Sequence, residues 1–143
     1  MILATKQNYT DSFRRTLAQP VPENGRPVTF MVLFYRAECG LKALFSDQEK
    51  IRAKPTDEQM KTLKTHNLGN IVSVLKVPAS ALGSRFPDFR LVRERTVPPH
   101  AWKGHAGENA HTVWRYGMEM ESDDERKMVE WLNRAVHYVN QQL

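Results

Sequence analysis

Arginine and aromatic residues alternate through the middle of the chain, and together they could bind phosphates and bases. Guanidinium groups contact phosphate oxygens, and aromatic rings stack on the bases of single strands. Arginine and tryptophan also dominate the energetics of protein–protein interfaces. The pattern therefore predicts a binding surface for a nucleic acid or nucleotide, or for a protein. The candidate nucleic-acid contacts are Arg85, Arg90, Trp102, Lys103 and Arg115.

A second polar group interrupts the most apolar stretch of the chain, residues 26–47. Glu38 and Lys42 are four residues apart, so on a helix they can form an ion pair. His66 could reach them from a neighbouring helix break. Such a cluster is either a satisfied structural network or the wall of a polar pocket. The expected pairing favours the structural interpretation, because charged groups are tolerated inside a bundle when they are paired.

Three histidines, His100, His105 and His111, lie close together in the sequence beside Glu108. Zinc ligands on helices use spacings of three or four residues, which these histidines lack, and no cysteine lies nearby. The single cysteine, Cys39, cannot form an internal disulfide and is expected in the core. The chain also lacks a glycine-rich phosphate loop and a GxSxG motif. The sequence thus predicts neither a metal nor a cofactor.

Composition indicates one globular domain, residues 1–143, of which 1–26 form a short helix and a linker. Hydrophobic content of 41% and charged content of 26% are ordinary for such domains. The net charge of +5 favours anionic partners. The acidic run 119–125 is interpreted as a solvated face or a contact with a second copy. No membrane span or signal peptide is evident, so we expect a cytoplasmic protein.

The helical pattern predicts an all-α bundle of about five helices around a central buried helix. That helix covers residues 26–47 and is apolar around nearly its whole circumference. Pro27 suits its first position. The other expected helices cover residues 9–18, 56–64, 67–75, 109–116 and 122–143, with a short helical turn after Pro78.

Local signals define several helix boundaries. Thr56 with Gln59, and Ser122 with Glu125, have the spacing of capping boxes. A break is expected near residues 65–67, because an unbroken helix would place the Asn67 amide in an apolar stripe. The stretch 89–97 alternates weakly and could be extended, but residues 85–100 are predicted to be irregular, since prolines flank and interrupt them.

Three stretches taken together resemble the HEPN family (higher eukaryotes and prokaryotes nucleotide-binding). They are FYRAECGLKALF at 34–45, THNLGNIV at 65–72, and VWRYGMEM at 113–120 before the final helix. The resemblance covers residues 28–143 and implies a prokaryotic helical bundle that forms a homodimer and binds RNA or a nucleotide.

Nuclease members of this family carry an arginine and a histidine separated by four to six residues. Arg95 and His100 have four residues between them, and Arg93 and His100 have six. The resemblance thus implies a metal-independent ribonuclease in which an arginine binds phosphate and His100 acts on the attacking ribose hydroxyl. Pro98 and Pro99 lie inside this motif and disfavour a continuous helix there. The alternative is a non-catalytic protein-interaction module or a subunit of a larger assembly.

Overall fold

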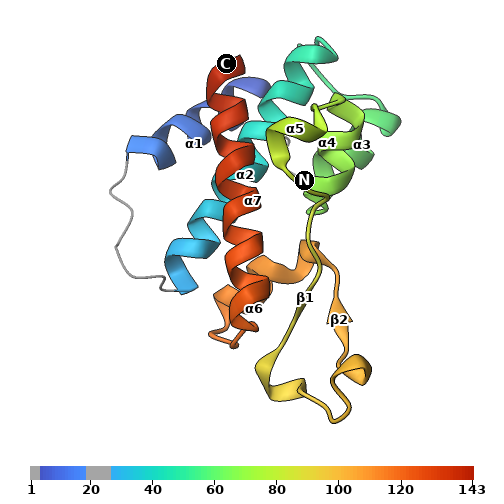
Figure 1. The fold of residues 1–143 in the computed structure, drawn as a ribbon. Coiled ribbons are helices and arrows are strands. Elements are labelled where there is room, and N and C mark those ends of the chain that lie inside the picture. The colour runs from blue at the N-terminus through green and yellow to red at the C-terminus, as the bar shows by residue number, and fades with distance from the viewer. Residues whose placement is uncertain (1–3, 19–26) are drawn as a thin grey trace.

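The computed structural model describes residues 4–18 and 27–143, which form a mainly helical bundle (Figure 1). Within these residues there are seven α-helices, where about five were predicted, and the short segments expected after Pro78 and at 109–116 are α5 and α6. The helices are α1 (Lys6–Ala18), α2 (Pro27–Gln48), α3 (Asp57–Lys64), α4 (Leu68–Leu75), α5 (Ala79–Leu82), α6 (Ala110–Arg115) and α7 (Ser122–Gln142). None of the helices in the described ranges is both long and apolar enough to cross a membrane. The predicted linker, residues 19–26, lies outside the described part of the chain.

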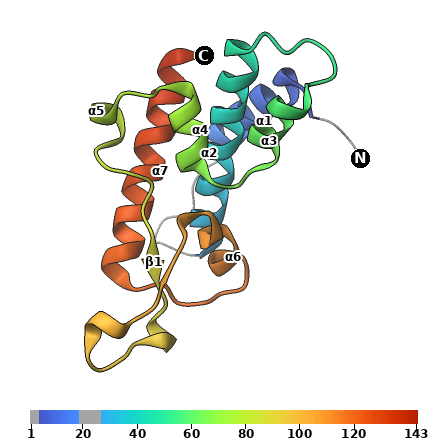
Figure 2. The same ribbon diagram turned by 90° about the vertical axis from the view of Figure 1, so that its right-hand side faces the viewer.

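Helix α2 packs against α1, α4, α6 and α7, and lies beside α7 in both views (Figures 1 and 2). It begins at Pro27, as predicted. The prediction that it is a central helix buried on nearly all sides is wrong for one face, where Val28 and Tyr35 are 60% and 50% exposed. The polar Arg36 is instead buried, because its guanidinium donates to the carbonyl of Thr16 in α1.

Close packing between α1, α2 and α7 depends on Gly40. A Cβ atom at Gly40 would lie 2.8 Å from Val139 and 2.9 Å from Phe13, both fully buried. The predicted apolar stripe of α7 is in the core, where Met128, Leu132, Ala135, Val136 and Val139 are all buried. These contacts bring the two long helices together along one core.

The start of each later helix follows from its capping residue. The capping box of Thr56 and Gln59 is present at α3, and Asn67 caps α4 by accepting from the Asn70 amide at 3.3 Å. The predicted break between α3 and α4 is therefore confirmed. The predicted box at Ser122 is wrong, because Glu121 is the capping residue of α7. Its carboxylate accepts from the amides of Asp123 and Asp124.

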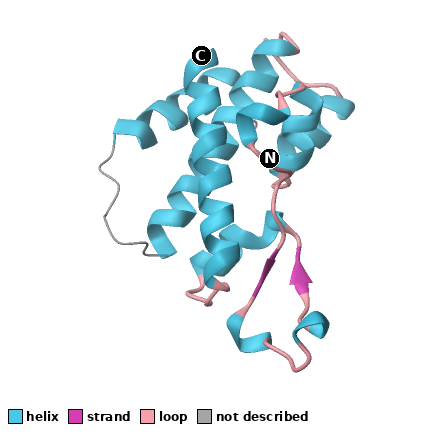
Figure 3. Cartoon of the chain, in the orientation of Figure 1, coloured by secondary structure: helices cyan, strands magenta, loops and turns pink. Residues whose placement is uncertain are grey.

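Residues 88–106 form a lobe that projects from the helices (Figures 1 and 2). The prediction of irregular structure up to residue 100 is wrong where β1 (Phe89–Arg90) pairs antiparallel with β2 (Gly104–His105) (Figure 3). Between these strands lie the 3₁₀ turns η1 (Val92–Glu94) and η2 (Pro99–Ala101), and η3 (Gly107–Asn109) follows β2. Two-residue strands are too short to produce a periodic sequence pattern, so this pairing was not predicted.

Candidate nucleic-acid interface

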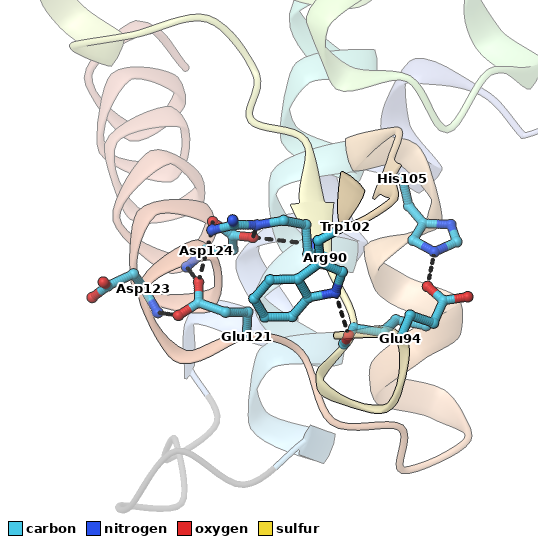
Figure 4. A network of polar contacts seen from close by, with 8 residues as sticks. Arg90, Glu94, Trp102, His105, Glu121, Asp123 and Asp124 are labelled. Atoms are coloured by element: carbon cyan, nitrogen blue, oxygen red, sulfur yellow. Dashed lines mark hydrogen bonds and ion pairs between the residues drawn. The ribbon is translucent and has the colours of Figure 1, made fainter. Parts of the chain in front are cut away.

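Arg90 on β1 ties the lobe to the start of α7 (Figure 4). Its Nε donates to Asp124 Oδ2 at 2.8 Å, its Nη2 to Oδ1 at 3.2 Å, and its backbone N–H to Oδ2 at 2.9 Å. Its guanidinium also lies 3.5 Å from a carboxylate oxygen of Glu121. Burial alone would raise the pKa of Asp124, but the hydrogen bonds and charge of Arg90 outweigh it, and the pKa is lowered. Arg90 is therefore committed to an internal ion pair.

Trp102 contacts Arg90 and a second arginine of the lobe. Its indole Nε1 donates to the carbonyl of Leu91 at 2.9 Å (Figure 4). The guanidinium carbons of Arg90 and Arg95 lie 4.7 and 5.0 Å from the centre of its ring system, within the range of cation–π contact. The half-buried indole thus holds two arginines close together.

His105 on β2 forms a second set of contacts within the lobe. Its Nε2 lies 2.6 Å from Glu94 Oε1, and its ring stacks on Phe89 with centroids 5.5 Å apart. The hydrogen bond from His105 lowers the pKa of Glu94, and the charges of Lys103 and Arg93 act in the same direction. The Glu94 carboxylate is therefore already hydrogen-bonded to His105.

The remaining cations of the lobe are not paired with any carboxylate of the described residues. Arg93, Arg95 and Lys103 are exposed and form no ion pair within residues 4–18 and 27–143. Residues 88–106 contain four Lys and Arg but only two Asp and Glu. Because Arg90 is neutralised by Asp124 of α7, the positive charge of the lobe that is not paired within the described residues lies on Arg93, Arg95 and Lys103.

The other predicted contact residues lie apart from this group. Arg85 is exposed in the segment before the lobe, and Arg115 is exposed at the end of α6. His100 is exposed in η2, and within the described residues no hydrogen bond or ion pair joins it to Arg93 or Arg95. The lobe therefore carries Arg90, Arg93, Arg95, Trp102 and Lys103, of which Arg90 and Arg95 contact the Trp102 ring, and it also carries His100 in η2.

The predicted polar group of α2 does come together. Glu38 Oε2 lies 3.7 Å from Lys42 Nζ, and Glu38 Oε1 lies 2.6 Å from His66 Nδ1 at the break before α4. Glu38 and Lys42 are buried, whereas the His66 side chain is 55% exposed. Burial lowers the pKa of Lys42, and the charge of Glu38 opposes that effect. The cluster joins α2 to the connection between α3 and α4.

His111 is a member of this cluster that the sequence did not identify. Its ring lies 4.9 Å from that of His66 and 5.1 Å from that of Phe34. Burial lowers its pKa, and the charge of His66 lowers it further. The three grouped histidines thus have separate environments, since His105 contacts Glu94 and His100 lies on the lobe surface.

The residues that hold the lobe were also missed. Glu121 and Asp124 belong to the acidic run that is interpreted as a solvated face or a contact with a second copy, but both pair with Arg90 within the chain. The signal that could have found them is this acidic run itself, which includes the first turn of the last helix and is opposite in sign to the arginine-rich segment.

Comparison of the chain with protein-family models, curated proteins and solved structures finds no match.

Replacing Glu38 with leucine is expected to lower the free energy of unfolding by about 3 kcal/mol, because it leaves the buried Lys42 unpaired. The double variant Glu38→Leu/Lys42→Met removes both charges and should recover most of that stability. Urea denaturation followed by circular dichroism measures the free energy of unfolding of both variants. Equal stability of the two variants would contradict the assignment of a paired, buried ion pair.

The Arg90–Asp124 contact predicts a defined pH dependence for Asp124→Asn. Because folding lowers the pKa of Asp124, the wild-type advantage is fully present above the ordinary value of 3.8. It disappears as the pH falls through the lower pKa of the folded state. The difference in urea midpoint between wild type and variant should be constant near neutrality and shrink below that value. A difference that does not change down to acidic pH would show that the ion pair contributes nothing.

Proposed function

We propose that this chain is a nucleic-acid- or nucleotide-binding helical protein of the HEPN type, built around a central α2, that contacts RNA through the lobe. The observation that carries the proposal is that Arg93, Arg95 and Lys103 are exposed and form no ion pair within the described residues, while Arg90 and Arg95 flank the ring of Trp102. Phosphate contacts supply most of the affinity of such surfaces, and a net charge of +5 adds attraction at longer range.

Contacts within the chain that hold the lobe in place support the proposal that it binds RNA. Arg90, Glu94 and His105 are occupied by contacts within the chain, which fix the positions of their neighbours. Free cations on a fixed support lose less conformational freedom on binding than cations on a flexible loop. The resemblance to the HEPN family adds the expectation of a cytoplasmic prokaryotic homodimer, in which two lobes would act on one RNA and raise its effective affinity.

A metal-independent ribonuclease is the narrower form of this proposal. An exposed imidazole, His100, lies on the same lobe as Arg93 and Arg95. In such an enzyme the arginines would hold the scissile phosphate, and His100 would accept the proton of the attacking ribose hydroxyl.

A non-catalytic protein-interaction module is the second candidate. The observation that favours it is Val97, which is 96% exposed on the lobe among prolines. An apolar residue beside arginine and tryptophan also suits a protein interface. The two candidates differ in their response to salt, because several phosphate contacts make binding fall steeply as ionic strength rises.

The double variant Arg93→Ala/Lys103→Ala should weaken binding of a fluorescent single-stranded RNA by about tenfold at low salt. It should also reduce the slope of log affinity against log salt by about 0.7 for each phosphate that is no longer neutralised. Fluorescence anisotropy measures both. The matched control is Arg14→Ala/Arg15→Ala, which removes two exposed charges from α1. Absence of RNA and DNA affinity in the wild type at low salt would favour the protein-interaction module.

His100→Ala should abolish RNA cleavage in the presence of a metal chelator while leaving the circular dichroism spectrum and RNA binding unchanged. The reason is that alanine removes the proton acceptor without disturbing a buried contact, since His100 is exposed. Cleavage is measured on a labelled RNA with wild type and variant purified in parallel, which excludes a contaminating nuclease. Equal cleavage by both proteins would contradict the catalytic role of His100, and no cleavage by the wild type would exclude the ribonuclease.

A further inference from the structure

A groove of about 940 Å³ lies between α4, residues 83–88 and α7. The lobe joins it directly, since Asp88 and Ala106 line it. The polar, charged and aromatic side chains that line the groove include Asn70, Ser73, Arg85, Phe86, Lys127 and Arg134, together with the acidic Asp88 and Glu130. Its volume is at the upper end of the range of about 300–1,000 Å³ that is typical of ligand sites.

The walls of the groove are held in place by specific contacts. Trp131 Nε1 on α7 donates to the carbonyl of Ser84 at 3.1 Å, which fixes the segment after α5. Gly83 has a φ of +81°, and a Cβ atom there would lie 3.0 Å from the Arg134 guanidinium. A Cβ atom at Gly107 would lie 2.3 Å from the carbonyl oxygen of Pro87. The two glycines thus allow the loop, α7 and the base of the lobe to approach closely.

Positive charge and a ring lie along the same groove. Arg85 and Lys127 are exposed, and neither has an ion pair within the described ranges. Arg134 forms an ion pair with Glu130, with 3.5 Å between its Nη2 and Oε1 of the glutamate, and the arginine side chain remains 45% exposed. The half-buried Phe86 lines the groove and packs against Trp131 and Phe34, with ring centroids 4.7 and 6.3 Å apart. This combination of cations, exposed amide and supported ring matches the groups that bind single strands, where phosphates meet cations and bases meet rings.

We infer that the groove holds a short single-stranded segment of the RNA whose neighbouring nucleotides contact the lobe. This inference rests on the proposed function and names the form of RNA that is bound. A recess of this volume accommodates a few nucleotides, whereas a duplex keeps its bases stacked inside and presents only its backbone. Because the groove continues into the base of the lobe, one strand can contact Lys127 and Arg134 and then Arg93 and Lys103.

Two groove variants test the inference by different means. Lys127→Ala/Arg134→Ala removes two cations, and Asn70→Glu places a negative charge in the groove. Asn70 is the third residue of α4, where glutamate is favourable for the helix, so weaker binding by this variant cannot come from a weaker helix start. Anisotropy is measured with a labelled 12-nucleotide oligouridine and with an RNA duplex of equal length.

Both groove variants should weaken oligouridine binding by about tenfold and duplex binding by less than about twofold. The double variant should also lower the salt slope for oligouridine by about 1.4, which is 0.7 for each of two phosphates. Arg14→Ala/Arg15→Ala is again the control for removal of charge. A decrease for oligouridine no larger than in this control, or equal decreases for duplex and oligouridine, would overturn the inference.

The lobe variant separates failure of this inference from failure of the proposed function. If Arg93→Ala/Lys103→Ala weakens RNA binding and the groove variants do not, the lobe binds RNA and the groove does not hold it. If wild type binds neither oligouridine nor duplex at low salt, both the proposed function and the inference are wrong.

Discussion

The ion pair between Arg90 and Asp124 is the contact on which the arrangement of the lobe depends. Strands of two residues each cannot hold a projecting segment, because even longer isolated hairpins are marginal in water. The guanidinium and backbone amide of Arg90 both bond to Asp124, and Asp124 is itself positioned by the Glu121 cap of α7. Trp102 then packs on Arg90. The first turn of the last helix therefore sets where the lobe and its free cations lie.

The helices were largely predictable because their signals are local. Pro27, Thr56 and Asn67 act within one turn of the helices that they begin, and each does what its residue type indicates. The cap of α7 was misassigned by one residue, since Glu121, Ser122 and the following acids all offer capping oxygens. The lobe strands could not be predicted, because strands of two residues give no periodic pattern and the lobe is held by contacts between Arg90 and residues 31 to 34 positions away.

In the candidate site, too, contacts within one helical turn were predictable and contacts between distant residues were not. Glu38 and Lys42 were expected to pair because they are one helical turn apart, and the break before α4 placed His66 within reach. The role of Arg90 was not evident, since nothing in the sequence separates it from Arg93 or Arg95. Only the fold shows that Arg90 is neutralised while Arg93, Arg95 and Lys103 remain free of ion pairs within the described residues. The groove beside the lobe likewise needs the fold, because it brings α7 against α4 and residues 83–88, which are about 40 or more positions earlier in the sequence.

The central claim is that RNA contacts the lobe near Trp102, and the indole N–H resonances of the tryptophans test it most directly. Trp102 is half-buried on the lobe, whereas Trp114 is 1% exposed and donates to Glu125 at 3.1 Å. In a nitrogen-15 NMR titration with oligouridine at low salt, we predict that the Trp102 indole signal shifts and that of Trp114 stays in place. RNA binding without a shift at Trp102 would contradict the account.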